Sequence, residues 1–146
     1  MLHLLEKAGL PADGVAEHLD GFFVARRRQQ PGASLATAIP AATTVIGCAG
    51  IEPYGSQALL RSVAVTPPLQ NVGVGRRLVE AALGRAIQNG ATEVYLLTTT
   101  AEGYFARLGF EHVERQAVCG PVTSSVEFTS ACPQSAAVMR RKSAIA

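Results

Sequence analysis

Two glycines and two arginines around a single turn predict a binding site for a phosphate-bearing ligand. The turn Gln70-Asn71-Val72-Gly73-Val74-Gly75 is followed at once by Arg76 and Arg77, and helical spacing of apolar residues begins at Leu78. The first N–H groups of a helix lack intrahelical acceptors and carry partial positive charge, and glycines let a bulky anion approach them. The pattern indicates either a pyrophosphate cradle or a plain loop-to-helix connection with two incidental glycines.

This turn is neither of the two commonest phosphate loops. It lacks the Gly-Lys-Ser/Thr ending of the nucleotide P-loop, and Leu78 stands where the dinucleotide fingerprint needs a third glycine. Gln70-x-x-Gly73-x-Gly75, five residues after Val65, instead resembles the coenzyme A motif of the GNAT superfamily of N-acetyltransferases. The block Tyr104 to Phe110, YFARLGF, resembles the aromatic-x-x-Leu-Gly-Phe element of the same superfamily.

Further segments resemble one subfamily, the arsenic-resistance N-acetyltransferases, which acetylate the amino group of arsinothricin-like glutamate analogues. The chain is also similar to the short acetyltransferase domains of N-acetylglutamate synthases. The segments are LLEKAGLP from Leu4, GIEPYG from Gly50, LLRS from Leu59, YLLTTTA from Tyr95, Glu127-Phe128, and CPQSA from Cys132.

This resemblance implies an acetyl-CoA-dependent N-acetyltransferase acting on the α-amino group of a small acidic amino acid. Arsinothricin and phosphinothricin are the first expectation for that acceptor. The alternatives are a glutamate N-acetyltransferase of metabolism and a non-catalytic acyl-CoA-binding sensor module. Acetylation of a protein lysine or a polyamine would predict an acidic acceptor groove, and the chain has eleven acidic residues without a cluster.

The resemblance also implies how the acetyl donor is held. A strand carrying Val63, Ala64 and Val65 would offer backbone groups to the pantetheine and the acetyl carbonyl, and it would splay from the next strand to admit them. Phe105 and Arg107 would lie along the adenylate or pantetheine arm. The pyrophosphate would be held by Gln70, Asn71, Val72, Gly73, Val74, Gly75 and Arg76.

Acetyl transfer to an amine needs a base for the ammonium and an acid for the leaving thiolate. Glu52 is the predicted base, because it ends an apolar strand beside the expected splay; the alternative is a solvated carboxylate at a strand end. A family tyrosine position holds Phe105 here, and Tyr104 is one residue earlier, turned by about 100° on a helix. Tyr104, Tyr54, a threonine from Thr98 to Thr100, or solvent is the candidate acid.

A glutamate-like acceptor carries two acidic groups, which favours guanidinium partners. Arg61 interrupts the apolar run LLRSVAV and stands two residues before Val63, so we expect the two on one face of the strand. Arg115, in an expected later strand, is the second candidate, with Tyr54 and Thr98 nearby. The alternative role for Arg61 is a structural ion pair, for example with Glu52.

These residues require an α/β fold of the GNAT type, a single domain over 1–146 with a mixed central sheet, splayed middle strands and flanking helices. The superfamily's first strand normally precedes LLEKAGLP, so we expect it to be missing, leaving a sheet edge that makes a homodimer plausible. Helices are predicted over 2–8, 12–19, from the cradle to 89, and 101–108. Strands are predicted over 22–27, 34–39, 43–52, 58–65, 93–100, 110–118 and 136–141.

Composition limits the other classes of function. A net charge of +2 without a basic patch predicts no nucleic-acid partner. The uncharged run from Gln29 to Ile51 is broken by prolines and glycines, so no membrane span is expected, and no secretory signal is visible. Cys48, Cys119 and Cys132 show no metal-binding spacing. We therefore predict a cytoplasmic protein without a metal.

Overall fold

The computed structural model describes residues 1–28 and 43–142. The strand expected at 34–39 lies outside the described residues. The helices are α1 (Leu2–Lys7), α2 (Val74–Gln88) and α3 (Glu102–Arg107), and the strands are β1 (Phe22–Arg28), β2 (Thr43–Tyr54), β3 (Gln57–Val65), β4 (Glu93–Thr98), β5 (Glu111–Val113) and β6 (Ala137–Lys142). Short 3₁₀ segments are η1 (Ala16–Gly21), η2 (Pro67–Leu69), η3 (Arg115–Ala117) and η4 (Pro121–Ser124), and η5 (Glu127–Ala131) is a π turn.

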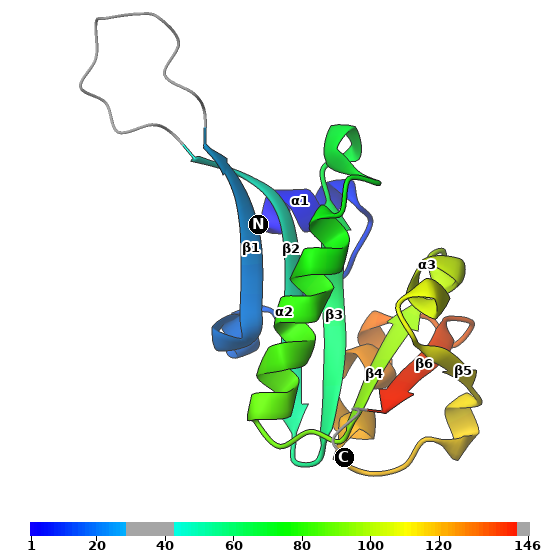
Figure 1. Ribbon diagram of the computed structural model, residues 1–146. Helices are drawn as coiled ribbons and strands as arrows, with labels where there is room; N and C mark the ends of the chain where they lie inside the picture. Colours follow the sequence, from blue (N-terminus) through cyan, green and yellow to red (C-terminus); the bar gives the residue numbers. More distant parts are fainter. Residues whose placement is uncertain (29–42, 143–146) are drawn as a thin grey trace, which may run out of the picture.

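The strands form one mixed sheet in the order β1-β2-β3-β4-β6-β5. β3 and β4 are parallel and are joined through α2, whereas the other neighbours are antiparallel. α2 covers one face of the sheet and packs its apolar side on Ile51, Leu60 and Leu96, while α1 lies on the opposite face (Figure 1). The predicted mixed sheet flanked by helices is confirmed.

The two central strands separate along their length. β3 pairs with β4 only from Gln57–Glu93 to Leu59–Tyr95, although β3 continues to Val65 and β4 to Thr98. Figure 1 shows the two strands diverging beyond these pairs, so that β4, β5 and β6 lean away from β3. The unpaired ends form a wedge, and the predicted splay is confirmed.

A β-bulge at Ser62 changes which way β3 points its side chains. Cys48 pairs with Ala64 and Gly50 with Arg61, so β3 carries one extra residue here, and Ser62 has a φ of +58°. Val63 packs against the core under α2, whereas Arg61 lies on the α1 side beside Pro11. The expectation that Arg61 and Val63 share a face is wrong, because the bulge breaks the alternation on which it rested.

The strand expected at 110–118 is much shorter. β5 spans Glu111–Val113 and pairs with β6, and the chain then turns into η3. Arg115 lies in that 3₁₀ turn and not in a strand, because its guanidinium donates to the carbonyls of Phe128, at 2.8 Å, and Pro133, at 3.2 Å. These bonds fasten η3 to the η5 segment and end the strand early.

Within 1–28 and 43–142, no helix combines the length and the apolar character needed to cross a membrane.

Candidate active site

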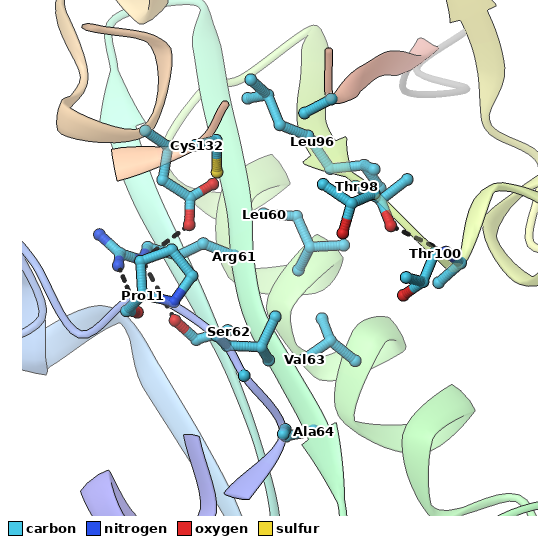
Figure 2. Close-up of a pocket in the computed structure, with 18 of the residues that line it drawn as sticks. Pro11, Leu60, Arg61, Ser62, Val63, Ala64, Leu96, Thr98, Thr100 and Cys132 are labelled. Atoms are coloured by element: carbon cyan, nitrogen blue, oxygen red, sulfur yellow. Dashed lines mark hydrogen bonds and ion pairs between the residues drawn. The ribbon is translucent and has the colours of Figure 1, made fainter. Parts of the chain in front are cut away.

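A cavity of about 290 Å³ lies in the wedge between β3 and β4. One wall is β3 from Leu60 to Val65, and the facing wall is the end of β4 with the loop into α3. Figure 2 shows Arg61 and Cys132 on one side of this space and Thr98 and Thr100 across from them. The cavity therefore occupies the place where the sequence predicted that the acetyl donor enters the sheet.

Arg61 and Glu127 are the two charged side chains among the described residues that line the cavity. Arg61 Nε lies 3.1 Å from Ser62 Oγ and 3.5 Å from Glu127 Oε1, and its Nη2 donates to Pro11 O at 3.1 Å. The exposed fractions of the Arg61 and Glu127 side chains are 0% and 4%, so water screens their interaction weakly.

Glu52 lies behind Arg61. Its Oε2 accepts a 2.8 Å bond from Arg61 Nη1, its Oε1 accepts a 2.6 Å bond from the Tyr54 hydroxyl, and His18 Nε2 is 3.7 Å away. Glu52 is 1% exposed and is not among the described residues that line the cavity. It is therefore no solvated strand end, and the ion pair considered for Arg61 is present; a role as base stays a prediction.

Tyr54 is occupied by the same carboxylate. Burial, the hydrogen bond to Glu52 and the charge of Glu52 together raise the pKa of Tyr54 well above its usual value. The Tyr54 hydroxyl therefore stays protonated near neutral pH. Tyr54 is not among the described residues that line the cavity. The structure places Tyr54 as a support for Glu52, and its predicted role toward an acceptor is untested.

Glu127 is the residue that sequence reasoning missed. It is the first residue of η5. Burial raises the pKa of its carboxyl to about 7; the Arg61 charge and a hydrogen bond from the Cys132 thiol lower this pKa, and the Glu52 charge raises it further. Val126-Glu127-Phe128 is too short for its pattern to predict a helix or a strand. A carboxylate between two apolar residues in an otherwise uncharged stretch was the available signal.

Cys132 lies against Glu127 in the same wall. Burial, the Glu127 charge and the hydrogen bond to that carboxylate raise the pKa of the Cys132 thiol to about 11, even though Arg61 and Arg115 act against the rise. The thiol is therefore neutral near pH 7 and donates to Glu127. It adds polarity to the wall without adding a charge.

The predicted cradle has the backbone shape that the sequence indicated. Asn71 and Gly73 have φ values of +64° and +91°, and α2 begins immediately after them. Gln70 donates its side-chain amide to Val65 O at 3.0 Å, which ties the turn to the end of β3. Arg76 is exposed and pairs with Glu80 at 3.1 Å. Binding of a pyrophosphate by these residues stays a prediction.

The aromatic block places neighbouring residues in different surroundings. Phe105 is buried and lines the cavity, whereas Tyr104 is not among the described lining residues. The Tyr104 hydroxyl oxygen lies 2.6 Å from the position that a Cβ would take at Gly75, at the start of α2. Burial raises the pKa of Tyr104. Arg107 lies with Arg76 in a separate groove between α2 and α3.

The other predicted acceptor-binding residues, Thr98 and Arg115, also differ in whether they line the cavity. Thr98 lines the cavity, and its hydroxyl accepts a 3.0 Å bond from the Ala101 N–H. Arg115 is absent from the described lining residues, because its guanidinium is turned to the η5 segment. Among residues 1–28 and 43–142, no group of three or more His, Cys, Asp or Glu side chains is arranged to hold a metal ion.

The sequence profile of the Acetyltransferase (GNAT) family matches residues 4–110, so this chain belongs to that family. An N-acetyltransferase of Chlorobaculum tepidum is 34% identical over 105 residues, which are 71% of this chain and 58% of the relative. An amino-acid acetyltransferase of Ralstonia nicotianae is 31% identical over 97 residues, which are 64% of this chain and 22% of that protein. The chain thus spans little more than half of the first relative and a smaller part of the second.

Two solved structures share the fold. The N-acetylglutamate synthase of Neisseria gonorrhoeae, complexed with coenzyme A and N-acetylglutamate, aligns with a TM-score of 0.71 at 19% identity, over 94% of this chain and 30% of that one. The protein Rv2747 of Mycobacterium tuberculosis, in complex with CoA, aligns with a TM-score of 0.71 at 21% identity, over 97% of this chain and 90% of that one.

Proposed function

We propose that this chain transfers an acetyl group from acetyl-CoA to the α-amino group of a small acidic amino acid, either glutamate or an analogue such as arsinothricin or phosphinothricin. The observation that carries the proposal is the cavity in the β3–β4 wedge. Among the described residues that line it, the charged groups are the buried guanidinium of Arg61 and the buried carboxylate of Glu127. Acetyl-CoA supplies the activated acetyl group. The chain binds acetyl-CoA, binds the acceptor and removes a proton from its ammonium group.

The donor site has three parts that fit coenzyme A. The wedge leaves the backbone of Val63 to Val65 without a partner in β4. The exposed turn before α2 presents the first N–H groups of that helix beside Arg76. Gly75 has no Cβ, so the Tyr104 hydroxyl can lie close to the backbone at the start of α2. No side chain of residue 75 then covers the first turn of the helix. Each part would accept a different section of the donor.

The acceptor site favours a zwitterion. An α-amino acid presents an ammonium and a carboxylate a few ångströms apart, and Arg61 and Glu127 offer the opposite charges 3.5 Å apart. Each terminal nitrogen of Arg61 carries a second N–H beyond its bond to Glu52 or Pro11. The threonines across the cavity, Thr98 and Thr100, are available to a distal acidic group. A polyamine would lack a partner for Arg61.

The test is thiol release from acetyl-CoA with phosphinothricin, arsinothricin, glutamate and spermidine offered separately. We expect release with the acidic amino acids and none with spermidine. Fast release with the two analogues and little with glutamate supports a resistance enzyme, whereas the reverse supports a metabolic one. Preference for spermidine contradicts the proposal, and acetyl-CoA binding without release for any amine identifies a binding module.

A further inference from the structure

The carboxylate of Glu127 has a position that ion pairing alone does not explain. A structural partner for Arg61 already exists, because Glu52 takes a 2.8 Å bond from Arg61 Nη1 outside the cavity lining. Glu127 instead reaches Arg61 Nε at 3.5 Å, a loose contact, while it faces the cavity. One carboxylate therefore holds the arginine, and the second is left facing the space where an amine would react.

We propose that Glu127 is the base that removes a proton from the acceptor's ammonium group, while Arg61 binds the acceptor beside it and Glu52 is a positioning residue that holds Arg61. The proposal rests on the acetyltransferase function proposed above and names the residue that performs its proton transfer. It also replaces the predicted base: both oxygens of Glu52 already accept bonds, from Arg61 and Tyr54.

The proton and electron balance is simple. The ammonium gives one proton to a Glu127 oxygen and becomes a neutral amine. The amine lone pair forms a bond to the acetyl carbonyl carbon, the carbon–sulfur bond breaks, and its electron pair leaves on sulfur. The second amine proton passes to the thiolate, and Glu127 returns its own proton to solvent. No oxidant, reductant or metal is needed.

The surroundings suit a base that works near neutral pH. Burial raises the pKa of the carboxyl to about 7, so both of its protonation states are populated there. The charged groups that act on it are Arg61 from β3 and Glu52 from β2, and the other titratable groups that interact with it are Cys132 after η5 and Tyr54 at the end of β2. The positive guanidinium prevents a larger rise, and the neutral thiol donates a bond to the ionised form.

The experiment compares Glu127→Gln with Glu114→Gln, an exposed carboxylate that is not among the described lining residues. The acceptor is whichever of the three amino acids wild type acetylates fastest, and kcat/KM is measured from pH 5.5 to 9 at saturating acetyl-CoA. We expect wild type and Glu114→Gln to show an ionisation near pH 7. Glu127→Gln should lose that ionisation and about 100-fold in kcat/KM at pH 7, while its acetyl-CoA affinity is unchanged.

A folded Glu127→Gln protein with the wild-type pH profile overturns the inference and leaves the proposed function standing. If wild type acetylates none of the acceptors, the proposed function fails and the base assignment fails with it. If the variant does not fold, ¹³C-labelled glutamate carboxyl signals of wild type provide the readout. A Glu127 signal that titrates near pH 7 and shifts when the acceptor binds supports the base, and one that titrates below pH 5 overturns it.

Discussion

Arg61 Nη1 lies 2.8 Å from Glu52 Oε2 in a region where the exposed fractions of the two side chains are 0% and 1%. Removing one partner of such a pair leaves an uncompensated charge in a poorly solvated place. We expect Glu52→Gln to lower the free energy of unfolding by about 3 kcal/mol, measured by urea denaturation.

The matched control is the exposed pair formed by Arg76 and Glu80, 3.1 Å apart on α2. Exposed helical pairs contribute little because water and salt screen them, so Glu80→Gln should change the stability by less than about 0.5 kcal/mol. Equal effects of the two substitutions would contradict the structural importance given to the buried pair.

The pH dependence of stability should report Glu127. Its pKa is about 7 in the folded chain, against a reference value of 4.5, so the folded state holds this proton more tightly than the unfolded state. Stability from this group is therefore complete below about pH 4.5 and is lost as the pH rises through 7. The loss amounts to at most about 3 kcal/mol.

The measurement is the difference in unfolding free energy between wild type and Glu127→Gln at pH 5 and pH 7.5. Subtracting the variant removes the contribution of the other titrating groups. We expect the difference to move against wild type as the pH increases, and a difference that stays constant across this range would show that the carboxyl is ionised throughout.

Gly75 and Tyr104 form a second measurable relationship. A Cβ at residue 75 would lie 2.6 Å from the Tyr104 hydroxyl oxygen but 3.6 Å from the ring carbon that bears it. Gly75→Ala should therefore destabilise the wild-type chain, and the same change in a Tyr104→Phe background should cost less. We expect a coupling of about 1 kcal/mol in a double-mutant cycle, and additive effects would contradict the contact.

Gly73 and Gly84 predict opposite results for the same substitution. A Cβ meets nothing within 4 Å at either position, but Gly73 has a φ of +91° and Gly84 lies inside α2. Gly73→Ala should destabilise by about 1–2 kcal/mol through backbone strain, whereas Gly84→Ala should stabilise by up to about 1 kcal/mol. Thermal unfolding of the two variants is the measurement, and a neutral Gly73→Ala would show that the turn can relax.

Arg61→Lys tests the acceptor site, because it keeps a charge for Glu52 while removing the planar fork. We expect KM for the acidic acceptor to rise about tenfold or more, since about 1.4 kcal/mol of recognition corresponds to that factor. KM for acetyl-CoA should change little. Arg115→Lys, whose guanidinium binds backbone carbonyls of η5, is the comparison. Equal rises in both KM values would remove Arg61 from acceptor binding.

Local patterns predicted the donor side of this fold well. The turn with its glycines, the end of α1 at Gly9 and the long apolar strands are encoded by neighbouring residues, and the structure has them within a few positions. Glu127 could not be found in this way, because its place beside Arg61 depends on how the loop after β5 folds back. The strand expected through Arg115 failed for the same reason: its end is decided by two distant carbonyl groups.

The bulge at Ser62 divides β3 into two parts, and the alternation of side chains between the two faces of the sheet is shifted by one residue from one part to the other. Leu60 before the bulge and Val63 and Val65 after it all face the core under α2, because the one extra residue at Ser62 shifts the alternation between them. If Ser62 were paired as a regular strand residue, strict alternation would turn Val63 and Val65 away from the core under α2 and turn Ala64 toward it. A single backbone position thus lets Arg61 lie on the α1 side while Val63 and Val65, a few residues further along the same strand, stay packed under α2.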